Sequence, residues 1–200
     1  MLLYSQMRVM GMKKKICVYC SASSSLAPKY YDFAAKVGEA IAKNGYDMVY
    51  GGTICGMMGV VADNVLKNGG EVTGVIPERI EKEHIGHPNL AKVIVTKDMR
   101  ERKATMEELS DVFLALPGGF GTLEEVSEMI VAKQLSLHTK PIVFLNFDGF
   151  YEDLNRAFEK YYSEGFAKDV MRDVYYMADS LDDAFSYLKS YKVKEYEYKW

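Results

Sequence analysis

The sequence predicts an α/β fold in which a doubly wound, mostly parallel sheet carries helices on both faces. Short apolar runs alternate along the chain with segments of helical periodicity, and the connections between them are short. Continuous apolar runs are typical of strands covered on both faces, as in parallel sheets. The sequence contains no internal repeat or linker. We therefore expect a single domain over residues 15–191, preceded by an N-terminal lead-in segment (1–14) and followed by a C-terminal tail (192–200).

Strands and helices alternate through the first half of the chain. The apolar run Ile16–Cys20 predicts the first strand, and the Ser-rich stretch after it predicts a loop. Apolar residues at helical spacing then predict a helix that Gly45 closes. The elements expected next are a strand at 47–50, the Gly-rich stretch GGTICGMMG (51–59), a helix through 60–66, strands at 72–76 and 92–96, and a polar connection (77–89) between those two strands.

The same alternation continues through the second half. Apolar runs predict strands, and apolar residues three and four apart predict helices. The alternating charged and aromatic tail KVKEYEYKW fits an edge strand, a docked segment or a frayed end. The expected elements are helices at 98–109, 122–137 and 181–191, strands at 111–116, 141–146 and 174–177, and a helix whose apolar face is Phe150, Leu154, Phe158 and Tyr161.

Composition excludes several classes of protein. Apolar residues make up 48% of the chain and charged residues 26%, as in an ordinary soluble globular domain. A net charge of −3 lacks the basic face of a nucleic-acid-binding protein, although it does not exclude a small anionic ligand. No apolar stretch approaches the roughly 20 residues that span a bilayer. The N-terminal lysines follow the apolar residues, the reverse of a signal peptide, so we expect a cytoplasmic protein.

The cysteines and histidines suggest neither redox nor metal chemistry. Cys17 and Cys20 form a C-x-x-C pair, but they lie in an apolar strand rather than at a helix N-terminus, where a thiolate would be stabilised. We interpret them as buried small hydrophobic residues. His84 and His87 have no further ligands at regular spacing. We therefore expect no metal ion and no cofactor.

Three loops, each following a predicted strand, are rich in Gly or Ser and lead into helices. They begin at Ser21, at Gly51-Gly52 and at Pro117. Ligands of doubly wound sheets bind beyond the carboxyl ends of the strands, so the loops should meet there. Glycines let backbone N–H groups approach a ligand, and helix N-termini add positive charge. The three loops together predict an anion site, most simply for phosphate, without the dinucleotide or P-loop fingerprints.

The stretch LPGGFGTLEE (116–125) allows two accounts of Glu125. Thr122 and Glu125 fit a capping box, in which the glutamate bonds back to the N–H of the helix cap. Alternatively, the helix start binds an anion and Glu125 takes part in chemistry. We expect the capping box in the empty site and a Glu125 that faces the substrate when it is bound. Arg102 and Lys103, one short helix upstream, would add cations to the site.

The motifs MRERK (99–103) and PGGFGTLEE (117–125) together resemble those of the LONELY GUY family, which is often named lysine decarboxylase-like. The likeness extends to GGTICGMMG, GVIPE (74–78), QLSLHTKPIVFLN (134–146) and DGFY (148–151), and covers most of residues 16–174. It implies a Rossmann-like fold and a homodimer. It also implies a phosphoribohydrolase that cleaves AMP or cytokinin riboside 5′-monophosphates to free base and ribose 5-phosphate.

The resemblance assigns roles to residues at the matching positions. Arg102 and Glu125 would be the catalytic pair, and Ser21, Gly51 and Gly52 are further candidates for substrate contacts from the loop analysis. The family implies substrate binding by Glu83, Lys103, Gly118, Gly119, Phe120, Gly121, Thr122, Leu123 and Glu124. Residues 131–136, VAKQLS, differ from the Thr-Trp-Ala-Gln-Leu-Gly common in the family, so base preference is open.

The proposed chemistry is physically coherent. Cleavage of an N-ribosyl bond develops oxocarbenium character, which a nearby carboxylate stabilises more in the transition state than in the ground state. Glu125 would lie one helical turn, roughly 5 Å, beyond the phosphate-binding helix start. The alternative function is a non-catalytic carrier of a nucleotide or phosphorylated cofactor on the same fold. A literal decarboxylase would need a Schiff-base lysine for pyridoxal phosphate.

Overall fold

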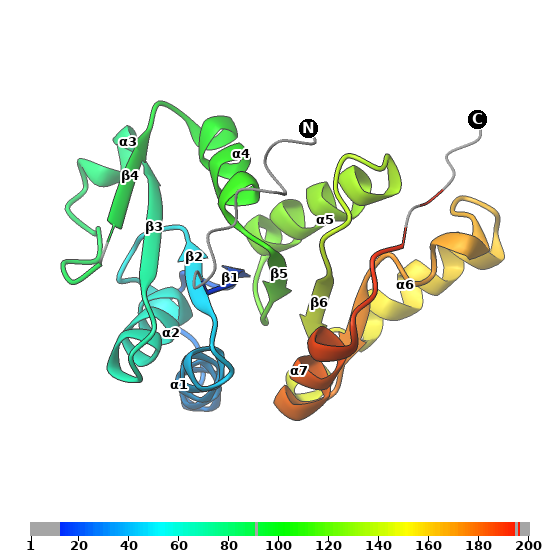
Figure 1. Cartoon of the computed structure of the whole chain (residues 1–200), viewed down its shortest axis with the longest axis horizontal. Coiled ribbons are helices and arrows are strands. Elements are labelled where there is room, and N and C mark those ends of the chain that lie inside the picture. Colours follow the sequence, from blue (N-terminus) through cyan, green and yellow to red (C-terminus); the bar gives the residue numbers. More distant parts are fainter. Residues whose placement is uncertain (1–12, 91, 195, 197–200) are drawn as a thin grey trace.

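The computed structural model describes residues 13–90, 92–194 and 196, in which seven strands form one sheet (Figure 1). The strand order is β4-β3-β2-β1-β5-β6-β7, and every neighbouring pair is parallel. The predicted doubly wound sheet is therefore confirmed. The strands are β1 (Lys15–Tyr19), β2 (Asp47–Tyr50), β3 (Val72–Pro77), β4 (Lys92–Thr96), β5 (Val112–Ala115), β6 (Ile142–Leu145) and β7 (Tyr176–Ala178).

Helices cover both faces of the sheet, as the sequence predicts. On one face lie α1 (Pro28–Lys43), α2 (Gly56–Lys67) and α7 (Leu181–Ser190). On the other lie α4 (Met99–Leu109), α5 (Phe120–Gln134) and α6 (Glu152–Ser163) (Figure 1). The short helices α3 (Glu78–Glu81), η1 (Phe147–Gly149) and η2 (Asp169–Met171) lie in connections.

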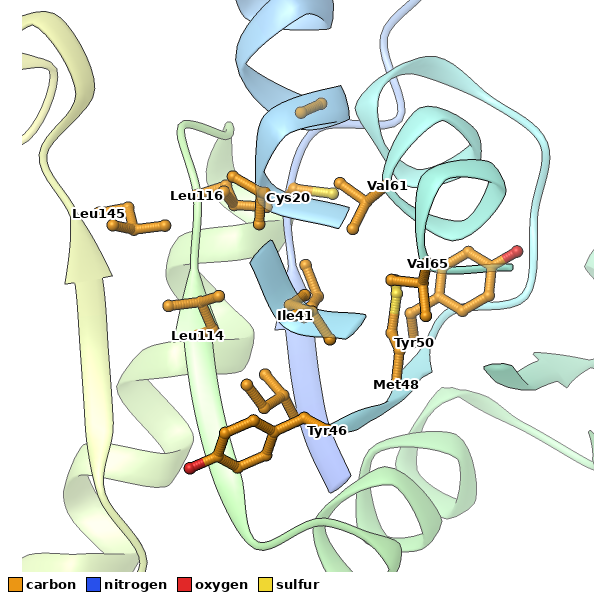
Figure 2. Packing of buried hydrophobic residues seen from close by; sticks show 14 of the residues in the cluster. Cys20, Ile41, Tyr46, Met48, Tyr50, Val61, Val65, Leu114, Leu116 and Leu145 are labelled. Carbon is orange, nitrogen blue, oxygen red and sulfur yellow. The ribbon is translucent and has the colours of Figure 1, made fainter. Parts of the chain in front are cut away.

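The central strand β1 shows why its residues form a continuous apolar run. Ile16 and Val18 pack into the core under α1, α2 and α7, whereas Cys17 and Tyr19 pack into the core under α4, α5 and α6. Because alternate side chains point to opposite faces, a strand covered on both sides has no solvent-facing position where a polar side chain would be favoured. Figure 2 shows part of the first core, where Ile41 of α1 and residues of α2 pack beside the strands.

The cysteines of the C-x-x-C pair are buried, as expected. Burial raises the pKa of the Cys17 thiol to about 12 and also raises that of Cys20, so neither favours a thiolate. Cys20 lies just past the end of β1, one residue beyond the observed strand. His84 and His87 do not pair with each other: His87 is buried and its Nε2 lies 3.1 Å from Asp63 Oδ1, whereas His84 is exposed.

Two helix starts differ from the prediction. α2 begins at Gly56 rather than near Val60, because Gly56 adopts φ of +56° and α2 starts directly against the loop after β1. α5 begins at Phe120 rather than Thr122 and ends at Gln134 rather than Leu137, since Ser136 takes φ of +57°. The expected polar connection over 77–89 also contains the short helix α3.

Residues 1–12 of the predicted lead-in lie outside the described residues. Part of the predicted tail packs on the domain: Tyr196 is buried, and its hydroxyl donates to Asp173 Oδ1 at 2.9 Å. Lys194 Nζ also donates to Asp173, at 2.6 Å from Oδ2. The docked-segment interpretation therefore holds for residues 194 and 196. Within the described chain, no helix has the length and apolar character needed to cross a membrane.

Candidate active site

The strand order places the predicted loops at one sheet edge. β1 is flanked by β2 and β5, so the loops after these three strands leave neighbouring positions at the carboxyl edge. The chain winds from β1 toward β4 on one side and toward β7 on the other, which makes this the topological switch point where such folds bind ligands. An open cavity of about 330 Å³ lies here, lined by Cys20, Ser21, Ala22, Met58, Met99, Arg102, Gly119, Gly121, Thr122, Glu124 and Glu125.

The N-terminus of α5 forms one wall of this cavity. Gly119 is the N-cap residue, and no side chain caps the helix or places an acidic group in its first turn. The first N–H groups of a helix have no intrahelical acceptor and carry partial positive charge. A Cβ atom added at Gly119 or Gly121 would meet nothing within 4 Å, so the backbone here is open to a ligand. The geometry suits an anion such as phosphate.

The expected capping box is absent, and that prediction was wrong. Thr122 is the third residue of α5 rather than its cap, and its side chain is buried. A Cβ atom at Gly118 would lie 2.2 Å from Thr122 Oγ1, so the hydroxyl group packs against the glycine of the preceding loop. Glu125 lies in the second turn and faces Arg102 rather than the helix cap.

Arg102 reaches the cavity from α4. Asp98 caps this helix, because its Oδ1 accepts the N–H groups of Arg100 and Glu101, each at 2.9 Å. One turn later the Arg102 side chain is buried, and its Nε donates to the Val75 carbonyl of β3 at 3.3 Å. These contacts fix the guanidinium group, which leaves its Nη1 facing the cavity and Glu125.

Arg102 and Glu125 form a buried ion pair at the cavity wall. Arg102 Nη1 lies 3.3 Å from Glu125 Oε1, and both residues are 8% exposed. Burial raises the pKa of the Glu125 carboxyl, and the adjacent Arg102 guanidinium partly offsets this rise. A buried carboxyl with a raised pKa, paired with an arginine in a cleft, is typical of an active site.

The loop after β2 makes room for the guanidinium group. A Cβ atom at Gly51 would lie 2.1 Å from Arg102 Nη2 and 2.5 Å from Met58 Cε. Only glycine therefore lets Arg102 lie against this loop. Gly52 adopts φ of +79°, which favours glycine, and packs beside Ile76 of β3.

The structure brings together some, but not all, of the predicted site residues. Those that line the cavity are Ser21, Arg102, Gly119, Gly121, Thr122, Glu124 and Glu125, with Gly51 against Arg102. Leu123 packs into the core under α5, and Phe120 is 92% exposed. Glu83 lies exposed after α3 and does not line the cavity.

Lys103 is not among the residues that line this cavity and instead connects two helices. Its Nζ forms ion pairs with Glu124 and, at 2.8 Å, with Glu128 Oε2 of α5. Burial alone would lower the pKa of the Lys103 ammonium group. Its hydrogen bonds to the two glutamates raise the pKa by more than this, so the net shift is upward. Lys103 thus ties α4 to α5 beside the Arg102–Glu125 pair.

Sequence reasoning missed four residues that line the cavity: Cys20, Ala22, Met58 and Met99. Met58 and Met99 lie within the quoted motifs GGTICGMMG and MRERK, so their place in the motifs was a usable signal. Their thioether side chains give the cavity an apolar wall near Arg102. A planar base would find such a surface there.

Comparison with known proteins identifies the family. The sequence profile of a family described as "Possible lysine decarboxylase" matches residues 58–188. A probable cytokinin riboside 5′-monophosphate phosphoribohydrolase of Oryza sativa subsp. japonica is 38% identical over 177 residues, which cover 88% of this chain and 79% of the relative. The chain belongs to the LONELY GUY family. A relative from Arabidopsis thaliana is 38% identical over 179 residues, covering 90% of this chain and 78% of its own.

Solved structures confirm the Rossmann-like fold of this LONELY GUY protein. The molybdenum cofactor binding protein of Rippkaea orientalis superposes with a TM-score of 0.69 at 23% identity, covering 90% of this chain and 98% of its own. The Moco carrier protein of Chlamydomonas reinhardtii gives the same TM-score and identity, covering 89% and 96%. At this identity the likeness extends to the fold alone.

Proposed function

We propose that this protein hydrolyses the N-glycosidic bond of nucleoside 5′-monophosphates, releasing free base and ribose 5-phosphate. Its substrates would be AMP and cytokinin riboside 5′-monophosphates, the latter being the compounds that the names of its relatives specify. The observation that carries the proposal is the buried Arg102–Glu125 pair beside an uncapped helix N-terminus. The helix start would bind the 5′-phosphate, and the pair would lie toward the ribose.

Glu125 is placed for the main catalytic role. It follows the Gly119 cap by six residues, about 9 Å along the helix axis, so it lies one turn beyond the N–H groups that would bind the phosphate. As a carboxylate it would stabilise the oxocarbenium-like ribose and orient or deprotonate the attacking water. Its raised pKa brings the general base closer to neutral pH, where proton transfer is most effective.

Arg102 has two tasks in this scheme. Its guanidinium group favours the ionised form of the Glu125 carboxyl, since an adjacent positive charge opposes the effect of desolvation. It would also donate hydrogen bonds to the departing base or the ribose hydroxyls. The Met58 and Met99 side chains would pack against the base. The roles predicted for Glu83 and Lys103 rest on the family resemblance alone.

Two other functions fit the site less well. A pyridoxal-dependent decarboxylase needs a lysine at its cofactor, and the residues that line this cavity include none. A non-catalytic carrier would need the phosphate loops, but it gains nothing from a buried arginine–carboxylate pair that costs desolvation energy. The pair therefore favours an enzyme over a carrier.

The direct test is incubation of the purified protein with AMP and with an N6-substituted AMP. We expect chromatography to show free base together with an equal amount of ribose 5-phosphate. Glu125→Ala, confirmed folded by circular dichroism, should lose nearly all turnover. Turnover equal to the wild type in that variant would contradict the role of Glu125, and no base from any nucleoside monophosphate would favour the carrier.

We also propose that the protein is a cytoplasmic homodimer. Val131, Leu135 and Leu137, at the C-terminal end of α5 and just beyond it, are 51%, 39% and 66% exposed and together form an apolar surface. The three cysteines are all free, which suits a reducing compartment. Light scattering should give twice the 22.6 kDa mass of the chain.

A further inference from the structure

Each of the three loops at the carboxyl edge receives a hydrogen bond from a tyrosine hydroxyl group. Tyr151 donates to the Leu116 carbonyl at 2.5 Å, at the start of the loop that precedes α5. Tyr50 donates to the Thr53 carbonyl at 3.2 Å, and Tyr31 donates to the Ser23 carbonyl at 3.2 Å. The three tyrosines come from different parts of the chain, yet each contacts the backbone of one loop.

Tyr151 makes the shortest of these contacts. It is 5% exposed, its ring packs edge-on against Phe144 at 5.1 Å between centroids, and its own N–H donates to Asn146 Oδ1 at 2.8 Å. The Leu116 N–H donates in turn to the Tyr19 carbonyl at 2.9 Å. Leu116 is therefore held on both sides, immediately before Pro117, which has no N–H group to contribute.

Tyr50 and Tyr31 act on the loops on the other side of the cavity. Tyr50 is fully buried at the end of β2, and its hydroxyl closes the turn of Gly51 and Gly52 onto Thr53. That turn lies against the Arg102 guanidinium group. Tyr31 is half-buried, and its hydroxyl also accepts the Leu26 N–H at 3.4 Å, so it links Ser23 and Leu26 within the loop after β1.

We propose that Tyr31, Tyr50 and Tyr151 are positioning residues that hold the three loops in the geometry that binds the nucleotide. The inference rests on the proposed function, because it takes the loops to be the phosphate and ribose site. Glycine-rich backbone loses more conformational freedom on ordering than other backbone does. A loop that is already held in place in the free protein has lost that freedom before binding, so the entropic cost of ordering it on substrate binding is smaller and the affinity is higher.

Substitutions of the three tyrosines should affect substrate binding and turnover to different degrees. Tyr151→Phe loosens the phosphate loop and leaves a buried carbonyl unpaired, so KM for AMP and Kd for ribose 5-phosphate should rise roughly tenfold. Tyr50→Phe loosens the turn beneath Arg102, so kcat should fall by a similar factor with a smaller change in KM. Tyr31→Phe should change either constant by no more than about threefold, because its hydrogen bond is solvent-exposed.

Tyr162→Phe is the matched control. Tyr162 is also buried, and its hydroxyl donates to the Met171 carbonyl at 3.1 Å, but that contact lies behind α6 and away from the three loops. This variant should lose stability comparable to Tyr151→Phe and keep wild-type kcat, KM and Kd. The comparison separates loop positioning from the general cost of a lost buried hydrogen bond.

The experiment combines calorimetric titration with ribose 5-phosphate, AMP kinetics and amide hydrogen exchange of the ligand-free protein. Exchange over residues 116–123 should become faster in Tyr151→Phe and stay unchanged in Tyr162→Phe. Equal exchange, Kd and KM in the two variants would overturn the inference. If Tyr151→Phe does not fold, Tyr50→Phe decides: a kcat on AMP equal to that of Tyr162→Phe would overturn the inference. A wild type that neither binds ribose 5-phosphate nor cleaves AMP would refute the proposed function, while the exchange data would still decide the anchoring.

Discussion

Replacement of Gly51 by alanine should displace Arg102 while the fold stays intact. The added Cβ would lie 2.1 Å from Arg102 Nη2 and 2.5 Å from Met58 Cε. Both atoms are at the ends of flexible side chains, so they can move without a shift of the backbone. Carbon and nitrogen atoms need about 3.5 Å between them. The guanidinium group must therefore move by more than about 1 Å.

A movement of this size is large compared with the contacts that hold Arg102. Its Nη1 lies 3.3 Å from Glu125 Oε1, and its Nε lies 3.3 Å from the Val75 carbonyl. A shift of about 1 Å would break at least one of these contacts. Misplacement of a catalytic group by that distance costs on the order of 100-fold in rate. We expect kcat on AMP to fall by about that factor.

The assay is release of adenine from AMP by Gly51→Ala, compared with Gly86→Ala. A Cβ atom at Gly86 would meet nothing within 4 Å, and this control should keep wild-type kcat. Thermal unfolding should show both variants folded. A folded Gly51→Ala protein with wild-type kcat would refute the role of Arg102, because the guanidinium group cannot stay in place beside that Cβ.

Three further predictions concern charge and assembly. Burial raises the pKa of the Glu125 carboxyl above its ordinary 4.5, so the folded state loses stability relative to the unfolded state as pH rises above that value. The Tm of Glu125→Gln relative to the wild type should therefore be higher at pH 7 than at pH 4, whatever the cost of leaving Arg102 without its carboxylate, whereas the exposed Glu108→Gln should show no such change. The buried Lys133 Nζ has no hydrogen-bond partner among the described residues, and burial lowers its pKa from 10.5 to about 8. In urea unfolding, Lys133→Met should have a free energy of unfolding roughly 1–3 kcal/mol above that of the wild type at pH 7. This difference should shrink as pH rises from 8 toward 10.5, because the wild type then folds with a neutral Lys133 amine at little cost. Leu135→Glu should convert the proposed dimer to a monomer in light scattering, and an unchanged mass would place the interface elsewhere.

The layered fold was predictable because its signal is local. In β1, Ile16 and Val18 are as apolar as Cys17 and Tyr19, and such a run has no solvated face in any fold. In α1 the apolar residues Phe33, Val37 and Ile41 likewise recur at helical spacing and form its buried face. The exact ends were less predictable, since α2 starts where Gly56 can take a positive φ against the loop after β1. That contact joins residues far apart in the sequence.

The site was predictable only as a set of residue types. The motifs indicated that Arg102 and Glu125 act together, but their contact depends on the Val75 carbonyl and on the space at Gly51. Neither determinant is visible in the spacing of the motifs. Lys103 shows the same limit. It is adjacent to Arg102 in sequence, yet its Nζ pairs with Glu124 and Glu128 of α5 and the residue does not line the cavity.

The start of α5 decides between the two accounts of Glu125. A capping box requires the glutamate three residues after the cap, and with Gly119 as cap that position is held by Thr122. Glu125 is then six residues from the cap, too far along the helix for its carboxylate to reach the cap N–H group. Two consequences follow from this shift of the helix start. The first-turn N–H groups keep no acidic partner and remain suited to an anion, and the carboxylate turns to Arg102. The uncapped helix start and the buried pair therefore have one cause, and a substrate with a phosphate and a ribose uses both.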